Sequence, residues 1–330
     1  MRQYLRFERL MTRFSLLFLC LLIVLPVSAE PITIPVELNI FAGREERVVV
    51  KDLEGLPAGE SRVWYSISKE KRTITKGTAR VESDNSVVLS VRLPELNPGV
   101  ALRFDLEIRA GSDQGRRIKE GALWTFSEQP RVSGFKPAGE RQLMLYDPKG
   151  NTEKAFQSIG LVCESVGRLE TLADATNAVI VVGEGVSLES ERGLSDVMTG
   201  AVLRGNRVLL LAPTDGVVKP LAGGPWRVLA GASVAVLGGE RKAGAPALDL
   251  GLYSPTNSLT KAFFRLGSDE SGVTTVTVNL DSGEQAVGWD YVQKPGRFRA
   301  CGLGLVENWD KKPAMRWFLL EMIEELNKEK

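Results

Sequence analysis

Between residues 30 and 128, apolar side chains alternate with polar or small ones. The clearest run is LRFDLEIR at 102–109, and similar runs occur at 32–40 and 87–93. With a period of two residues, successive side chains lie on opposite faces of a strand. Each run therefore predicts a strand with one buried and one solvated face. Turn residues such as Asn97-Pro98-Gly99 separate the runs. This spacing predicts an antiparallel sandwich of about seven strands.

The pattern of apolar and polar residues changes after residue 140. The segment 129–140 contains two prolines and two glycines and is predicted to be a linker. Beyond it, short runs of apolar residues alternate with stretches of helical period. Strands that are apolar on both faces and separated by helices are typical of a parallel sheet covered on both sides. The predicted elements are strand 141–148, helix 151–160, strands 161–166 and 178–183, a helix capped by Ser187 and ended by Gly205, strand 207–213, strand 297–306, and a helix capped by Asp310.

Together these patterns predict two domains. Residues 30–128 form an all-β immunoglobulin-like sandwich, and residues 141–330 form an α/β flavodoxin-like three-layer domain. Its mainly parallel five-stranded core sheet has the expected order 2-1-3-4-5. Residues 217–285 are rich in glycine and alanine and are either an insertion or an extension, with strands expected at 274–280 and 284–292.

The cysteines are expected to be free. In the predicted order, Cys163 and Cys301 lie on opposite edges of the core sheet. That separation is about four interstrand spacings of roughly 4.8 Å, beyond the reach of a disulfide. We therefore expect two free, buried thiols.

The first 29 residues have the pattern of a signal peptide. Four arginines accompany the apolar run at 14–27, which is too short to span a bilayer comfortably. Small residues at Val27-Ser28-Ala29 predict cleavage before Glu30. Met11 is an alternative start, and an uncleaved membrane anchor is the alternative to cleavage. Cys20 lacks the small residues that precede a lipidated cysteine, so we expect no lipidation.

Composition narrows the functional classes. The 42 basic and 41 acidic side chains nearly cancel, which leaves no positive excess to neutralise a nucleic acid backbone. The chain contains no histidine. A Ser-His-Asp or Cys-His-Glu relay therefore cannot be built, and histidine-ligated zinc is excluded as well.

Two runs in the second domain carry a family resemblance. NAVIVVGEGVSLESERGLSDVMTGAVLRGNRVLLLAP and GRFRACGLGLVENWDKKPAMRWFLLEMIEEL resemble the class I glutamine amidotransferase-like superfamily, in the degenerate form often found in exported bacterial proteins. In catalytic members the fourth strand ends in an elbow that presents cysteine, with histidine and glutamate after a later strand. Here Ala212 or Pro213 stands about where that nucleophile would be, and Glu307 has no imidazole to orient. The resemblance implies the fold without the acyl-transfer chemistry.

A Gly-Asn-Thr turn at 150–152 opens the first predicted helix and is similar to the run with which flavodoxins hold the flavin phosphate. Asp147 would repel a phosphate and Pro148 removes a donor, so a plain turn capped by Asn151 or Thr152 is the alternative. The Gly-x-Gly at 183–185 lacks the third glycine of a dinucleotide fingerprint and is predicted to be a structural turn.

Carboxylates can hydrolyse glycosides without histidine, which keeps Glu184, Asp215 and Glu307 as candidates for that chemistry. The carboxyl edge of a parallel sheet is where ligands collect. The candidate residues at that edge are Asp147, Lys149, Asn151, Thr152, Glu184, Thr214, Asp215, Glu307, Asn308 and Trp309.

The sequence therefore predicts an exported, periplasmic or extracellular bacterial protein without catalytic activity. We expect it to bind or assemble with a protein or glycan partner of the cell envelope or extracellular space. No cofactor, metal or nucleic acid is expected, and contact with a membrane would come only through an uncleaved signal segment. The alternatives are a carboxylate-based hydrolase acting on glycans and a flavin- or phosphate-binding module.

Overall fold

The structure is a computed structural model. It describes residues 36–53, 55–57, 59–130, 141–219, 226–233, 237–238, 260–265, 273–280, 283–293 and 295–327. Val36–Lys330 form one compact unit. The expected signal segment 1–29 and all but the first two residues of the expected linker 129–140 lie outside the described residues. Among the described residues, no helix is long and apolar enough to cross a membrane.

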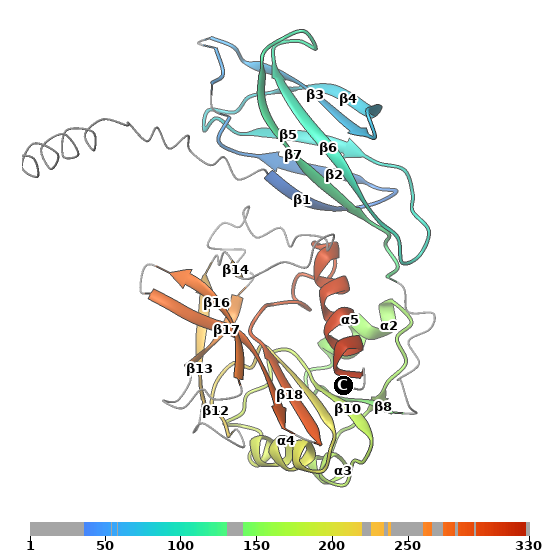
Figure 1. The fold of residues 1–330 in the computed structure, drawn as a ribbon, viewed down its shortest axis with the longest axis vertical. Coiled ribbons are helices and arrows are strands. Elements are labelled where there is room, and N and C mark those ends of the chain that lie inside the picture. The colour runs from blue at the N-terminus through green and yellow to red at the C-terminus, as the bar shows by residue number, and fades with distance from the viewer. Residues whose placement is uncertain are drawn as a thin grey trace, which may run out of the picture. The chain divides into compact units, whose positions relative to one another are not determined.

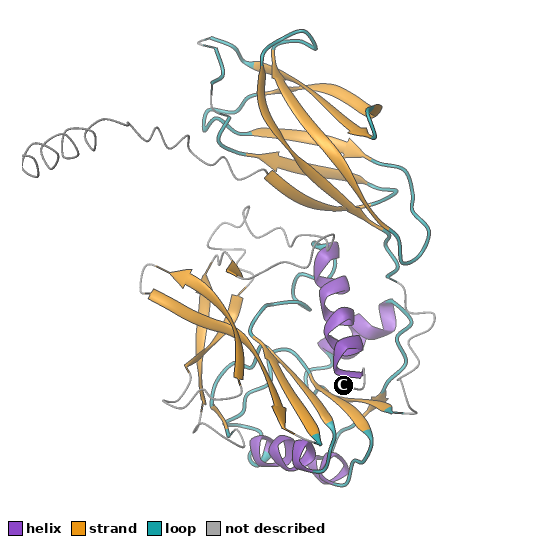
Figure 2. Ribbon diagram, viewed as in Figure 1, coloured by secondary structure: helices purple, strands orange, loops and turns teal. Residues whose placement is uncertain are grey.

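The alternating N-terminal region forms strands throughout (Figures 1 and 2). Five strands form one sheet in the order β1-β7-β6-β3-β4, and β2 pairs with β5 in a second sheet. β1 and β7 run parallel, whereas the other neighbours are antiparallel. The strands are β1 (Val36–Phe41), β2 (Glu45–Val50), β3 (Arg62–Lys69), β4 (Arg72–Arg80), β5 (Val87–Arg92), β6 (Ala101–Ala110) and β7 (Arg117–Phe126).

The apolar positions of these strands form one core. β6 buries Phe104, Leu106 and Ile108, the residues that the alternation places on one face. Val50 and Leu89 of the second sheet belong to the same cluster, so the two sheets pack face to face.

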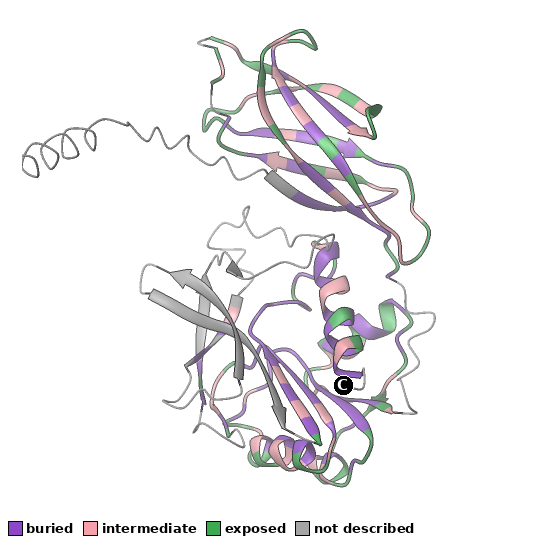
Figure 3. Ribbon diagram, viewed as in Figure 1, coloured by how far each residue is buried: buried purple, intermediate pink, exposed green. Residues whose placement is uncertain are grey.

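The second region is built on five parallel strands in the predicted order. The sheet runs β9-β8-β10-β11-β18, and each neighbouring pair is parallel. All residues of β10 are buried, because helices cover both faces of the sheet (Figure 3). The second strand is much shorter than predicted, because only Glu164 and Ser165 pair with β8. The bounds are β8 (Gln142–Tyr146), β9 (Glu164–Ser165), β10 (Ala178–Val182), β11 (Arg207–Leu211) and β18 (Gly296–Cys301).

Helices lie on both faces of these strands (Figure 1). On one face, Leu172 and Met198 from α3 and α4 pack on the sheet. On the other face, Phe156 of α2 and Leu319 of α5 belong to a separate buried cluster. The expected three layers are therefore present. The helices are α2 (Asn151–Ser158), α3 (Leu169–Ala173), α4 (Leu194–Leu203) and α5 (Pro313–Asn327).

Three predicted helix caps are wrong. The N-cap of α2 is Gly150, so neither Asn151 nor Thr152 is the cap. α4 begins at Leu194, because Gly193 adopts a left-handed φ of 87° and separates the helix from the preceding turn. Ser187 belongs to that turn, where its hydroxyl accepts the N–H of Ser190. α5 begins with Pro313 as its first helical residue, so Asp310 lies too far upstream to cap it.

The described strands between residues 217 and 293 extend the sheet. β17 pairs antiparallel with β18, and the sheet continues through β15 and β13 to β12, while β16 pairs with β17 and with β14. The whole sheet is therefore mixed, and the strands expected at 274–280 and 284–292 are present. The added strands are β12 (Val217–Val218), β13 (Trp226–Ser233), β14 (Leu237–Gly238), β15 (Thr260–Arg265), β16 (Val273–Leu280) and β17 (Gly283–Gln293).

Both cysteines of the described region are free, as expected, although Cys163 is only partly buried. Burial raises the pKa of the Cys301 thiol to about 12. We expect Cys301 to resist alkylation at neutral pH in the folded protein, because the thiolate is the reactive form. Peptide mapping after iodoacetamide treatment, with and without urea, measures this. Equal labelling of Cys301 in both conditions would contradict the expectation.

Candidate functional site

A pocket of about 440 Å³ opens at the carboxyl ends of the parallel strands. It lies at the switch point of the sheet, because the chain passes from β8 outward to β9 and then returns to β10 on the other side. In open α/β sheets, ligands bind at such a point. The lining residues are Lys149, Asn151, Lys154, Ala155, Ser158, Glu184, Gly185, Lys261, Val306, Glu307, Trp309 and Asp310.

Glu184 anchors the pocket from the end of β10. Its side chain is 5% exposed, and its two carboxylate oxygens accept the backbone N–H groups of Val306 (2.7 Å) and Glu307 (3.2 Å). Its own N–H donates to the Thr152 hydroxyl at 2.9 Å. Glu184 therefore connects the loops after β10 and β18 to helix α2.

Lys261 of β15 joins two carboxylates in this pocket. Its ammonium nitrogen lies 2.5 Å from Glu307 Oε2 and 3.5 Å from Glu184 Oε1. Burial lowers the pKa of Lys261, but the hydrogen bond to Glu307 and the two carboxylate charges raise it more, so the net shift is upward. Lys261 is thus a cation at neutral pH and cannot serve as a nucleophile.

The pKa of Glu184 is also raised, although the same ion pair would lower it. Desolvation by burial is the largest influence and exceeds the effects of the two N–H donors and Lys261. The raised pKa values mean that the charged form is disfavoured for Glu184 but favoured for Lys261. Exposure explains this difference, because Lys261 is 38% exposed and its charge is stabilised by two carboxylates.

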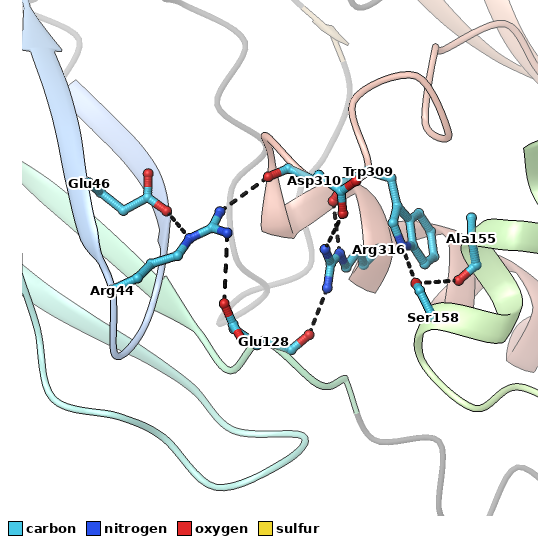
Figure 4. Close-up of polar contacts among 8 residues, drawn as sticks. All are labelled: Arg44, Glu46, Glu128, Ala155, Ser158, Trp309, Asp310 and Arg316. Carbon is cyan, nitrogen blue, oxygen red and sulfur yellow. Dashed lines mark hydrogen bonds and ion pairs between the residues drawn. The ribbon is translucent and has the colours of Figure 1, made fainter.

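Trp309 and Asp310 form the wall of the pocket next to α5. The Trp309 indole N–H donates to the Ser158 hydroxyl at 2.9 Å, and that hydroxyl donates to the carbonyl of Ala155. Arg316 donates to the Trp309 carbonyl and to the Asp310 carboxylate, both at 2.8 Å (Figure 4). The wall is therefore fixed to α2 on one side and to α5 on the other.

Two loop residues of the N-terminal region, Arg44 after β1 and Glu128 after β7, brace the same wall (Figure 4). The carbonyl of Glu128 accepts a 2.8 Å hydrogen bond from Arg316. Arg44 donates to the Asp310 carbonyl at 3.1 Å, and its guanidinium lies 3.9 Å from the centre of the Phe41 ring. The guanidinium of Arg316 lies 4.7 Å from the same ring. The position of Asp310 thus depends on both regions of the chain.

Five of the ten predicted edge residues line this pocket. They are Lys149, Asn151, Glu184, Glu307 and Trp309. Thr152 is fully buried and accepts the N–H of Glu184. Asn308 is also buried, and its amide donates to the Gly304 carbonyl. These two side chains hold the loops around the pocket rather than line it.

Asp147 occupies the start of α2. Its Oδ2 accepts the N–H of Glu153 at 3.0 Å, and its Oδ1 is buried against Gly183 without a hydrogen-bond partner among the described residues. A carboxylate therefore already occupies the place where a phosphate would meet the helix N-terminus. This geometry disfavours the flavodoxin mode of flavin binding.

Thr214 and Asp215 belong to a separate cluster after β11. Asp215 Oδ1 accepts the Ser187 hydroxyl at 2.7 Å and the N–H of Glu189 at 3.1 Å, while Oδ2 accepts the Thr214 hydroxyl. Slight burial raises the pKa of Asp215, but these hydrogen bonds lower it by more, so the net shift of the pKa is downward. Asp215 holds the turn after β10 to the turn after β11.

The elbow after β11 is sharp and closed. Ala212 has a φ of 24°, a positive value that is costly for a residue with a side chain. Its N–H donates to the Cys301 carbonyl, and its own carbonyl accepts the N–H of Gly185 at 3.0 Å. Ala212 is 1% exposed. The backbone thus turns sharply here but presents only a buried methyl group.

Sequence reasoning missed Lys154, Ser158, Lys261 and Asp310 as pocket residues. Ser158 and Lys154 could have been found, because both lie one turn or more along the helix that follows the candidate Gly-Asn-Thr turn. The sequence gives no such indication for Lys261, because the surrounding segment lacks the periodicity of a helix or a strand. In the described part of the chain, no group of three or more Cys, Asp or Glu side chains could hold a metal ion.

Close packing at Gly183 supports the loop that carries Glu184. A Cβ on Gly183 would lie 2.7–2.9 Å from three atoms of Asp147, whose carboxylate is fixed by the N–H of Glu153. We expect Gly183→Ala to lower the free energy of unfolding by about 1–3 kcal/mol in urea titrations. Gly167→Ala is the control, because its Cβ would meet nothing within 4 Å. Equal stability of the two variants would contradict the packing argument.

Comparisons with known proteins give little further information. A scan of known protein families finds no match, and neither does a search of curated proteins. Among solved structures, a candidate glycoside hydrolase from Bacteroides vulgatus is 9% identical, with a TM-score of 0.21, over 45% of this chain and 29% of its own.

Two further structures match at similar levels. The immunoglobulin-like domain of mouse leukocyte-associated immunoglobulin-like receptor 1 is 14% identical, with a TM-score of 0.19, over 29% of this chain and 94% of its own. A sialyltransferase from Photobacterium damsela is 9% identical, with a TM-score of 0.21, over 53% and 42%. TM-scores this low establish neither the fold nor the function of this chain.

Proposed function

We propose that this chain is an exported, non-catalytic protein that binds a small polar ligand in the pocket between α2 and the loops after β10 and β18. The observation that carries the proposal is the position of a polar pocket at the switch point, beside a strand end that offers only the methyl group of Ala212. A volume of about 440 Å³ lies within the range of small-molecule sites.

The chemistry of the pocket favours binding over turnover. Both oxygens of Glu184 are held by backbone N–H groups, and the side chain is almost fully buried. Lys261 carries a proton and lies between two carboxylates. Glu184 and Lys261 are thus occupied by protein partners and hold the shape of the pocket. Acyl transfer needs a nucleophile and a base, which the described residues do not present at this edge.

We test the pocket with a blocking variant. Asn151 is exposed at the start of α2, so Asn151→Trp should fill the opening without removing a described contact. Native mass spectrometry with a set of sugars, sugar acids, amino acids and short peptides should give one-to-one complexes with the unaltered protein. The variant should lose them. Complexes that survive in the variant, or none with any compound, would contradict the proposal.

A carboxylate-based glycan hydrolase is the second candidate, because Glu184 and Glu307 both contact Lys261 and therefore lie close together. Hydrolysis of aryl glycosides that is lost in Glu307→Gln would favour it. We expect no turnover, because Glu184 cannot reach a substrate while it holds Val306 and Glu307.

The proposal includes fold and location. We propose an immunoglobulin-like sandwich followed by a flavodoxin-like domain of the amidotransferase-like type. The pairing of β2 with β5 opposite β7-β6-β3-β4 supports the sandwich, and the order β9-β8-β10-β11-β18 supports the flavodoxin-like domain.

The proposal of export rests on the signal-peptide pattern of residues 1–29. N-terminal sequencing of the protein recovered outside the cytoplasm should start at Glu30, and recovery of intact residues 1–29 would contradict cleavage.

A further inference from the structure

The charges around the pocket do not balance. Each of its three carboxylates has a cationic partner, because Lys261 contacts Glu184 and Glu307, and Arg316 contacts Asp310. Lys149 and Lys154 also line the pocket, and among the described residues neither has an acidic partner within ion-pair distance. Because Lys261 serves both Glu184 and Glu307, these four cations exceed the three carboxylates by one. The two ammonium groups without an acidic partner among the described residues belong to lysines that line the pocket.

Two further polar groups are open to a ligand. The amide of Asn151 and the second carboxylate oxygen of Glu307 make no hydrogen bond to any described residue, and Glu307 is 54% exposed. The hydroxyl of Ser158, in contrast, is occupied by Trp309 and Ala155. Free amide and carboxylate groups at this position can accept and donate hydrogen bonds to ligand hydroxyls.

We propose that the ligand is a small hydroxylated anion of the acidic-sugar class. Its carboxylate or phosphate group lies between Lys149 and Lys154, and its hydroxyl groups meet Asn151 and Glu307. This inference rests on the proposed binding function. Ammonium groups form charge-assisted hydrogen bonds with oxyanions, and these bonds are stronger than those between neutral groups.

The anion is held by side chains and not by the helix N-terminus. Asp147 already accepts the N–H of Glu153 at the start of α2. Lys149 is nevertheless well placed, because its ammonium nitrogen would lie 3.3 Å from a Cβ on Gly185, a residue of the pocket floor. The absence of a side chain on Gly185 leaves room for this lysine over the loop after β10.

Four probes that share one sugar skeleton separate charge from shape. Isothermal titration calorimetry at low salt compares glucose, glucosamine, glucuronate and glucose 6-phosphate. We expect at least one of the two anions to bind about tenfold or more tightly than glucose, and glucosamine to bind most weakly. Preference for glucuronate identifies a carboxylate ligand, and preference for glucose 6-phosphate identifies a phosphate ligand.

Charge removal locates the contact. Lys149→Gln combined with Lys154→Gln should reduce binding of the preferred anion to the level of glucose. Lys76→Gln is the matched control, because Lys76 is an exposed lysine of β4 outside the pocket. It should bind the anion as the unaltered protein does.

Three outcomes would overturn the inference. Glucose could bind as tightly as both anions, the control could lose as much affinity as the pocket variant, or none of the four probes could bind. The binding function is judged separately, by whether Asn151→Trp abolishes the complexes formed with the wider set of compounds. If a neutral ligand bound the unaltered protein and not Asn151→Trp, the inference of an anionic ligand would be refuted and the proposed binding function would be supported.

Discussion

Arg316→Ala is expected to lower the free energy of unfolding by about 2–4 kcal/mol. The Arg316 side chain is only 11% exposed, and its three donor nitrogens each make a 2.8 Å hydrogen bond, to Trp309, Glu128 and Asp310. Its guanidinium also lies over the rings of Phe41 and Trp309. Truncation removes all of these interactions together and leaves two carbonyl groups without a donor. Urea unfolding measures the loss.

The matched control is Arg117→Ala. Arg117 makes an ion pair with Glu120, but the two side chains are 59% and 66% exposed. Exposed pairs contribute about 0–1 kcal/mol, so this variant should be almost as stable as the unaltered protein. Arg316→Lys should fall between the two, because a lysine keeps the charge but cannot reach three acceptors at once. A loss in Arg316→Ala no larger than in Arg117→Ala would refute the bracing role.

Glu184→Ala is the second large effect, with an expected loss of about 2–4 kcal/mol. The substitution leaves the N–H groups of Val306 and Glu307 without their acceptor and removes one partner of Lys261. Lys261 keeps Glu307, so the loss stays below that of breaking an isolated buried pair. Glu184→Gln should lose less, because its amide oxygen can still accept one N–H. Thermal and urea unfolding of both variants measure the difference, with Glu120→Ala as the exposed control.

The same residue predicts a pH dependence. Burial raises the pKa of Glu184 above its ordinary value of 4.5, so the folded state binds a proton more readily than the unfolded state. The part of its contribution to stability that depends on this proton is therefore fully present below the ordinary pKa and is lost as pH rises through the raised pKa. The stability of the unaltered protein relative to Glu184→Gln should decline over that range. A difference that grows with pH would contradict the direction of the shift.

The sequence predicted most of the architecture because local periodicity carries it. The fully apolar runs around Ile180 and Leu209 predicted central strands, and the stripe at Leu319 predicted a helix face that covers the sheet, in preference to one that docks a partner. The alternation of strands with helices indicated a parallel sheet, and the order 2-1-3-4-5 was expected because it is the usual order of flavodoxin-like domains. The helix caps were less predictable, because Ser187 fits the cap pattern and only the backbone angle of Gly193 moves the helix start.

The site was predictable only in part. Glu184 and Glu307 were found because both follow core strands. Lys261 was not, because it reaches the pocket from an antiparallel strand whose pairing is set by distant segments, and only the fold brings β15 near β18. Asp147 and Thr152 were singled out for the right loop, yet both side chains satisfy the backbone of their own surroundings. Position in a loop does not distinguish a ligand contact from a local hydrogen bond.

The parallel pairing of β1 with β7 has a consequence for how the chain assembles. These are the first and last strands of the N-terminal region, so the edge of that sheet is completed only when residues up to Phe126 are available. During synthesis, β1 therefore has no strand of its sheet to pair with until β7 has been made.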